Sequence, residues 1–242
     1  MCVSTYVMSD LHGCYDAYMQ MLEKIHFSDE DMLYVVGDVV DRGPHPMKIL
    51  LDLMKRDNVV CLAGNHEQMA LECLTFLLKE ITEENVDEFA SNTEVVEKLI
   101  NWQQNGSRTT TDEFHKLDAR TRKAVVDFIA DFDMYEEVHV GDQVYILVHA
   151  GLGSFAPDKE MWEYELHELV WERPDYETPY FPDKYVITGH TPTVFIEANP
   201  RPGYIFRKNN HIAIDCGAGF GGRLGCICLE TGEEFYVECG SG

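Results

Sequence analysis

Apolar runs and helical repeats alternate along the first third of the chain. Each apolar run has the length and composition of a strand, and a polar loop and a stretch with helical spacing follow it. The predicted strands cover residues 2–8, 32–36 and 59–62, and the predicted helices cover about 15–25, 44–56 and 66–79. Pro44 fits the first turn of the second helix. Three strand–helix units in succession imply parallel strands with helices on the faces of a sheet.

The rest of the chain breaks this rhythm. Residues from about 80 to 133 show helical periodicity, for example at Val95, Val96, Leu99 and Trp102, which predicts a helical insertion over the sheet. Strand-like runs follow at residues 134–140, 144–148, 185–188, 203–206, 211–214, 224–229 and 234–237. Their short length, close spacing and turn residues fit antiparallel pairing, so we expect the second half to form a mixed or antiparallel sheet packed against the first.

We therefore predict an α/β fold of the α+β sandwich type, in which two mixed β-sheets pack together and are flanked by helices. A length of 242 residues fits one large domain. The predicted organisation is a single domain over residues 1–242 that contains the helical insertion at about 80–133.

Polar loops directly follow five of the apolar runs. They are Asp10-Leu11-His12-Gly13, Gly37-Asp38 with Asp41-Arg42-Gly43, Gly64-Asn65-His66-Glu67, His149-Ala150-Gly151 and Gly189-His190-Thr191. Because the carboxyl ends of strands in an open α/β sheet line one crevice, we expect these loops to converge on one site.

Six side chains in these loops are candidate metal ligands: Asp10, His12, Asp38, Asn65, His149 and His190. Taken singly, each has a structural explanation as a cap, a turn residue or a buried histidine. Together, so many buried polar groups would be costly without divalent cations to satisfy them. Three imidazoles and three oxygen donors suit manganese, iron or zinc better than calcium. Two metals about 3.5–4 Å apart would fit if Asp38 bridges them, an arrangement suited to displacement at phosphorus.

The loop that holds Asp38 also carries a second carboxylate and a guanidinium. Arg42 can donate two hydrogen bonds to a phosphoryl group. Asp41 can orient a histidine that protonates the leaving oxygen, and His66 is the candidate. A simple salt bridge between Asp41 and Arg42 is the structural alternative. A zinc-protease motif H-E-x-x-H is excluded because Ala70 stands where the second histidine would be.

Composition narrows the range of partners and the cellular compartment. The formal net charge is −24, so we expect no binding to nucleic acid and none to anionic membranes. The eight cysteines show no C-x-x-C spacing and fit reduced core thiols, with Cys226 and Cys228 on one face of a strand. We find no signal peptide or membrane-spanning run, so the expected location is cytoplasmic.

The combined motifs resemble those of the calcineurin-like metallophosphoesterases. The shared patterns are D-x-H-G, G-D-x-x-D-R-G, G-N-H-E, H-A-G and G-H-T, in that order between Asp10 and Thr191. Asp41-Arg42, and Pro192 in place of a second histidine after His190, are similar to the phosphoprotein phosphatase branch. Within it, "SDLHGCY", "GNHEQM" and "GHTPT" resemble the bacteriophage lambda-type and bacterial protein phosphatases and the sister symmetrical diadenosine tetraphosphate hydrolases.

The resemblance implies a dinuclear-metal phosphatase. Its first metal would take Asp10, His12 and Asp38, and its second would take Asp38, Asn65, His149 and His190. The family chemistry is in-line attack by a metal-bridging hydroxide, with manganese the first choice of metal and iron, zinc, nickel or cobalt as alternatives. Arg42, Arg173 and Asn65 would hold the phosphoryl group, and His66 with Asp41 would serve the leaving oxygen.

Three functional readings follow from these residues. The first is a serine/threonine protein phosphatase, with phosphotyrosine as a further substrate. The alternative is a symmetrical bis(5'-nucleosyl)-tetraphosphatase, for which Trp102, Arg108, Arg120, Arg122 and Arg207 are weak candidates to hold a second nucleotide. A noncatalytic scaffold that binds a basic partner through the acidic stretch "EITEENVDEF" is the third, and the intact ligand set disfavours it.

Overall fold

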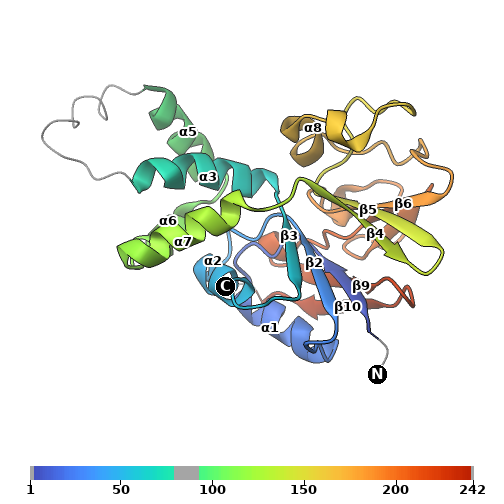
Figure 1. Cartoon of the computed structure of the whole chain (residues 1–242), viewed down its shortest axis with the longest axis horizontal. Helices are drawn as coiled ribbons and strands as arrows, with labels where there is room; N and C mark the ends of the chain where they lie inside the picture. Colours follow the sequence, from blue (N-terminus) through green and yellow to red (C-terminus); the bar gives the residue numbers. More distant parts are fainter. Residues whose placement is uncertain (1–2, 79–92, 241–242) are drawn as a thin grey trace, which may run out of the picture.

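The computed structural model describes residues 3–78 and 93–240, which build two five-stranded sheets. The first sheet has the order β10-β9-β1-β2-β3 and lies in the lower half of Figure 1. Its strands are β1 (Thr5–Met8), β2 (Met32–Val36), β3 (Val59–Leu62), β9 (Arg223–Cys228) and β10 (Glu234–Glu238). Strands β1, β2 and β3 are parallel, whereas β9 is antiparallel to both of its neighbours.

The second sheet has the order β4-β5-β6-β8-β7. Its strands are β4 (Tyr135–Val140), β5 (Gln143–Val148), β6 (Lys184–Thr188), β7 (Phe206–Lys208) and β8 (His211–Ala213). Strands β5, β6 and β8 are parallel, and the outer strands β4 and β7 are antiparallel to their neighbours. Both sheets are therefore mixed, as predicted.

The structure decides one alternative of the strand prediction and corrects two of its details. The second half was expected to form a mixed or antiparallel sheet, and it is mixed, with β5, β6 and β8 parallel because the connections between them are long enough for crossovers. The last two strands, β9 and β10, return to the first sheet beside β1. Strand β7 begins at Phe206, where the predicted run at 203–206 ends.

Successive side chains of a strand point to opposite faces of the sheet, and they pack into two different layers of the core. Tyr6 and Met8 of β1 pack into the cluster that includes the helices, while Val7 between them packs into a second cluster. That second cluster also contains Leu147 of β5 and Ile187 of β6, so it lies between the two sheets. The two sheets thus form a sandwich, and its shared layer of apolar side chains fixes their edges relative to each other.

Helices cover the outer faces of the sandwich, as Figure 1 shows. Those of the first units are α1 (Tyr15–Lys24), α2 (Pro46–Leu53) and α3 (Asn65–Leu77), and α8 (Leu166–Val170) packs on the second sheet. Short 3-10 helices are η1 (Met161–Glu163), η2 (Thr193–Phe195) and η3 (Ala218–Phe220). The proline in the first turn of α2 is Pro46, not Pro44, because Pro44 still belongs to the loop after Gly43.

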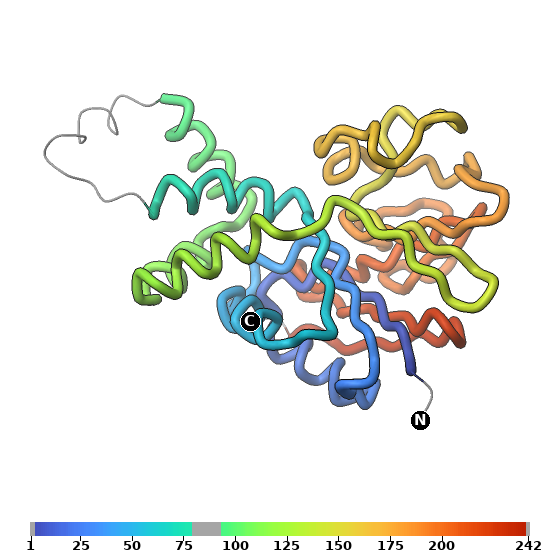
Figure 2. The backbone as a smooth tube through the Cα atoms, in the orientation of Figure 1, coloured from blue at the N-terminus to red at the C-terminus, as the bar shows by residue number. Residues whose placement is uncertain are grey.

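The predicted insertion contains helices α5 (Thr93–Gln104), α6 (Arg108–Phe114) and α7 (Ala119–Ala130). In Figures 1 and 2 they gather with α3 at the end of the molecule opposite the second sheet. Trp102 and Phe114 are fully buried in the same core cluster as the first sheet. The segment returns at the end of β3, where the Ala63 N–H donates to the Asp133 carbonyl (2.8 Å). The acidic stretch "EITEENVDEF" lies outside the described residues.

Two sequence expectations concern the thiols and the membrane. All seven described cysteines are free thiols, as predicted, and Cys2 lies outside the described residues. Cys226 and Cys228 pack into one cluster and Ile227 into the other, which confirms the same-face prediction. No helix within residues 3–78 and 93–240 has the length and apolar character needed to cross a membrane.

Candidate metal centre

The parallel strands of both sheets end at the same place. Polar residues follow them directly: Asp10 after β1, Asp38 after β2, Asn65 after β3, His149 after β5, His190 after β6 and Asp215 after β8. All but His190 are buried, and His190 is half-buried. The five polar loops predicted from the sequence thus converge, and a sixth strand end, at Asp215, joins them.

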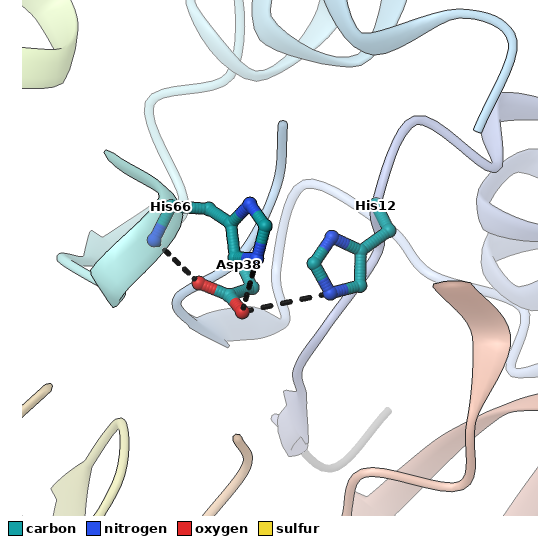
Figure 3. Close-up of side chains that lie close together, drawn as sticks. All are labelled: His12, Asp38 and His66. Carbon is teal, nitrogen blue, oxygen red and sulfur yellow. Dashed lines mark hydrogen bonds and ion pairs between the residues drawn. The ribbon is translucent and has the colours of Figure 1, made fainter. Parts of the chain in front are cut away.

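Asp38 lies at the centre of the cluster. Its Oδ2 is 3.5 Å from Nε2 of His12, and its Oδ1 is 3.3 Å from Nε2 of His149. Two overlapping groups of ligand atoms therefore share this carboxylate, one with His12 and His66 and the other with His149 and His190. Figure 3 shows the rings of His12 and His66 next to the carboxylate, with Nε2 of each ring joined to the same Asp38 oxygen. This sharing is the arrangement that a bridging ligand requires.

Asn65 and Asp10 complete the candidate ligand set. Oδ1 of Asn65 lies 3.1 Å from Nε2 of His149 and 2.9 Å from Nδ1 of His190, so it joins the second group. The Asp10 carboxylate lies 4.0 Å from Nε2 of His12 and accepts the backbone N–H of His190 (3.1 and 3.2 Å). The six predicted ligands thus occupy one cluster, although their roles as ligands stay predictions.

Two of the buried histidines, His12 and His149, are oriented by backbone carbonyls. Nδ1 of His12 donates to the carbonyl of Val40, and Nδ1 of His149 donates to that of Val36, both at 2.9 Å. Since a carbonyl only accepts, Nδ1 of each ring carries a proton, and Nε2 is the nitrogen that faces Asp38. A histidine held in this way is prepared to bind a cation, so the donor set fits two divalent metals.

The loops adopt a backbone conformation that costs energy. Non-glycine residues with positive φ in these loops are Asp10, His12, Asp38, Asp41, Arg42 and His190, with φ between 41° and 72°. Each such residue costs on the order of 1–3 kcal/mol, and such conformations cluster at functional sites. Gly64 and Gly189 allow close packing, because a Cβ there would lie 2.3 Å from Asp38 Oδ1 and 2.2 Å from Asp10 Oδ2.

The electrostatics of the cluster favour a bound cation. Burial alone raises the pKa of Asp38, but His149, His66 and His12 together hold that pKa well below its ordinary value, so Asp38 is ionised. Burial raises the pKa of Asp10 to about 7, with His149 opposing this and Asp38 reinforcing it. Burial lowers the pKa of His149, yet the Asp38 carboxylate raises it to about 10 overall. A cation at Nε2 of His149 would therefore displace a proton.

His66 and Asp41 form a buried pair beside the cluster. Nδ1 of His66 lies 2.6 Å from Oδ2 of Asp41, and neither side chain is exposed. Asp41 also accepts from Nε1 of Trp102 (2.7 Å) and Oγ1 of Thr110 (2.6 Å). Nε2 of His66 points to Asp38 Oδ2 at 3.9 Å, which puts it among the groups near a metal. The pair predicted for proton transfer is thus assembled and supported from α5 and α6.

Trp102 and Thr110 were not predicted for this role. Trp102 was a weak candidate for holding a nucleotide, and that prediction was wrong, because its ring is fully buried and its N–H is used by Asp41. No local sequence pattern indicates either contact, because both residues lie more than 60 positions from Asp41. The helical insertion therefore does more than cover the sheet, since it holds the Asp41–His66 pair.

Arg42 reaches across the cluster instead of pairing with Asp41. Its Nη1 lies 2.6 Å from Nε2 of His12, and its Nη2 lies 2.9 Å from Nε2 of His66. Its guanidinium also stacks over the ring of Phe220, 4.6 Å from the ring centroid. If His12 binds a metal through Nε2, the guanidinium has to leave that nitrogen, which frees its N–H groups for a phosphoryl group.

Glu67 and Asp215 were also missed as parts of the site. The buried Glu67 carboxylate accepts the backbone N–H groups of Asp38, Val39, Val40 and Gly64 at 2.7–3.2 Å, and so holds two ligand loops together. Its only signal was its place in the G-N-H-E motif. Burial and the nearby Asp10 raise the pKa of Asp215 well above its ordinary value. Asp215 follows an apolar run, so the rule that found the other loops would have found it.

A pocket of about 550 Å³ opens above the cluster. Asp38, Asn65 and His190 form its base, and Arg42 and Arg173 contribute positive charge to its wall. The remaining lining residues are Asn105, Trp171, Pro192, Phe195 and Phe220. Arg173 is exposed, and its positive charge contributes to lowering the pKa of His190, after burial and His149. The pocket therefore combines a polar base, two guanidinium groups and aromatic walls.

The fold and this cluster define a metal-dependent phosphoesterase. The family model for calcineurin-like phosphoesterases matches residues 3–194, and the chain belongs to that family. The family binds metals, and the two groups of ligands that share Asp38 fit a dinuclear site.

Curated relatives are named for hydrolysis of dinucleoside tetraphosphates. The chain is 40% identical over 118 residues to a symmetrical bis(5'-nucleosyl)-tetraphosphatase of Buchnera aphidicola, which is 48% of this chain and 42% of that protein. It is 26% identical over 249 residues to an asymmetrical bis(5'-nucleosyl)-tetraphosphatase of Halalkalibacterium halodurans, covering 90% of this chain and 87% of that protein. The match to the Buchnera aphidicola protein thus spans less than half of either chain.

Solved structures share the fold. A crystal structure described as a candidate diadenosine tetraphosphatase has a TM-score of 0.69 at 16% identity and covers 99% of this chain and 95% of that one. A serine/threonine protein phosphatase from Saccharomyces cerevisiae has a TM-score of 0.54 at 13% identity, covering 99% and 80%. Both phosphatase groups that the sequence resembled therefore appear, and the fold does not separate them.

Proposed function

We propose that this chain hydrolyses dinucleoside polyphosphates, with diadenosine tetraphosphate as the model substrate. One observation carries this choice: the pocket over the ligand cluster combines two guanidinium groups with exposed aromatic rings, Phe195 and Phe220. Guanidinium groups suit phosphates, and aromatic rings suit nucleobases. The names of the curated relatives support the same class. This reverses the order of the two main readings from the sequence, which placed protein phosphatase first.

The proposed metal sites follow the sequence prediction. Asp10, His12 and Asp38 would hold one divalent cation, and Asp38, Asn65, His149 and His190 would hold the other, with manganese as our first choice. When bound, such cations activate water and stabilise the charge that develops on phosphoryl oxygens. The strained ligand loops and the fixed orientations of His12 and His149 mean that little rearrangement of these donors is needed.

The protein groups divide the remaining work. Arg42 and Arg173 bind and orient the phosphoryl group under attack, and Asn65 contributes from the base of the pocket. His66 donates a proton to the leaving oxygen through Nε2, because its Nδ1 is held by Asp41. The hydrogen bonds from Trp102 and Thr110 keep Asp41 oriented toward His66.

A second candidate is a phosphoprotein phosphatase. The Asp41–His66 pair and the two arginines would serve a phosphate monoester equally well, because they act on the phosphoryl group and the leaving oxygen. The two candidates differ in what the rest of the pocket binds. They also differ in products, since a phosphopeptide releases inorganic phosphate.

The deciding experiment compares kcat/KM of manganese-loaded protein on diadenosine tetraphosphate and on a phosphoserine peptide. We expect the dinucleotide to be preferred and symmetrical cleavage to give two ADP molecules. ATP with AMP would indicate asymmetrical cleavage. A preference for the peptide would overturn the proposal, and the variant Asp38→Asn controls for contaminating phosphatases.

A further inference from the structure

Phe195 stands at the boundary between two hollows of the surface. It lines the pocket over the ligand cluster and also a neighbouring hollow of about 610 Å³. Arg173 is the other residue that the two hollows share. A ligand whose phosphates lie at the cluster would therefore pass Phe195 on its way into the second hollow.

The Phe195 ring is exposed but its backbone is held firmly. The side chain is 69% exposed, and it makes no aromatic stacking or cation–π contact with any described residue. Its helix η2 is anchored by the Thr193 N–H, which donates to the Asp215 carbonyl (2.8 Å), and by Asn199, which donates to the Thr193 carbonyl (3.1 Å). The ring therefore offers its surface to a ligand in either hollow, and its backbone is held in place.

Phe220 differs from Phe195 in this respect. One face of the Phe220 ring is covered by the Arg42 guanidinium at 4.6 Å from the centroid. The Phe220 ring therefore packs against the guanidinium that would bind the phosphoryl group. The Phe195 ring has no such contact with a described residue, whereas Trp171, the third aromatic residue lining the pocket, lies against the rings of His167 and His190.

The second hollow is chemically unlike the first. Tyr176 and Ile196 give it apolar walls, and carboxylates lie at its edge. Asp175 already accepts from Thr178, and Glu177 pairs with Lys208, but Glu197 has no hydrogen bond or ion pair within the described part of the chain. Negative charge at this edge repels phosphate. It favours a neutral group that offers N–H or O–H donors, as a nucleobase amine or a ribose does.

We propose that Phe195 is a specificity-determining residue that stacks on a nucleobase, with the nucleoside seated in the second hollow and Glu197 accepting a hydrogen bond from it. This inference rests on the proposed dinucleoside polyphosphate hydrolase function, because the nucleoside enters as part of that substrate. The phosphates stay at Arg42 and Arg173, and Phe195 selects what they are attached to.

The test separates nucleoside binding from phosphate binding. For each variant we would measure KM for diadenosine tetraphosphate and the inhibition constant of inorganic tetraphosphate, which has no nucleoside. Phe195→Ala should raise KM about tenfold, equivalent to about 1.4 kcal/mol, within the range for loss of one base stack. The inhibition constant of tetraphosphate should change much less.

Two further variants make the comparison specific. Phe195→Leu keeps an apolar side chain but removes the ring, so it should restore only part of the affinity. Val194→Ala is the matched control, because Val194 is 52% exposed on the same 3-10 helix but lines neither hollow. Its KM should equal that of the wild type.

The outcomes distinguish this inference from the proposed function. If wild type cleaves the dinucleotide and Phe195→Ala changes both constants equally, or neither, the role of Phe195 is overturned and the proposed function stands. If wild type cleaves a phosphopeptide but not the dinucleotide, both fail, and the acidic edge of the second hollow becomes a site for basic peptide side chains.

Discussion

The base and the rim of the catalytic pocket are built on different principles. At the base, Asp38, His66 and His149 are almost completely buried, and each has several fixed partners. At the rim, Phe195 is mostly exposed and Arg173 is exposed, and neither side chain has a hydrogen bond or ion pair among the described residues. Chemistry needs fixed geometry, whereas substrate selection needs surface that can vary without loss of the fold.

This difference explains why the sequence motifs identify the family but not the substrate. The motifs of the family belong to the base, and so the base determines the reaction class. The substrate depends on rim residues that belong to no motif. We therefore expect substitutions in the base to reduce turnover on every substrate, and substitutions in the rim to change the ranking of substrates.

Asp38→Asn should have the largest effect. It removes the charge between His12 and His149, so both metal positions should weaken and turnover should fall about 10⁴-fold or more, since metal ions supply several kcal/mol of transition-state stabilisation. Metal analysis should show fewer than two equivalents, with exposed Asp29→Asn as the control. Two full equivalents in the Asp38 variant would refute the bridging role.

His66→Asn should lower kcat by about 10²- to 10⁴-fold, the usual contribution of a general acid. The metal content should stay at two equivalents, because asparagine removes the proton donor and leaves the proposed ligands in place. Substrates with good leaving groups should lose less activity than those with poor leaving groups. An equal loss on both would show that His66 acts as a ligand, as its 3.9 Å distance from Asp38 allows.

Trp102→Phe tests whether the helical insertion supports the base. It keeps the buried ring but removes the N–H that donates to Asp41 at 2.7 Å. Loss of a buried hydrogen bond to a charged group costs about 1.5–3 kcal/mol, so kcat should fall at least about tenfold on poor leaving groups. Trp162→Phe is the matched control, because Trp162 is 73% exposed and far from Asp41 in sequence. Unchanged kinetics for Trp102→Phe would limit that residue to packing.

Arg173→Lys should have the smallest effect and should act mainly on KM. Lysine keeps the charge but loses the planar fork, so KM should rise about three- to tenfold with little change in metal content. Arg201→Lys controls for loss of an exposed arginine, because Arg201 stacks on Tyr204 and lines neither hollow. Equal KM values for both variants would show that Arg173 does not bind the substrate.

Hydrophobic patterns predicted the bounds of helices and strands well where an apolar run was clearly delimited by polar loops. Strand β2 has its predicted bounds, and the ends of β3 match as well, because an apolar run between polar loops allows little choice. The pairing of the second half was left as mixed or antiparallel, since strand direction depends on the connections between strands, which a short apolar run does not indicate. Asp215 was missed although it directly follows the predicted strand at residues 211–214.

The sequence by itself determined the reaction class, since each ligand candidate directly follows a strand and the types of side chain dictate the chemistry. The tertiary structure decided which distant groups support them. Trp102 and Thr110 reach Asp41 only because the helices pack on α3 and the first sheet, and Phe195 faces the pocket only because η2 is tied to Asp215. Such contacts join residues far apart in the chain, and their geometry is set by the packing of the two layers, which no local pattern encodes.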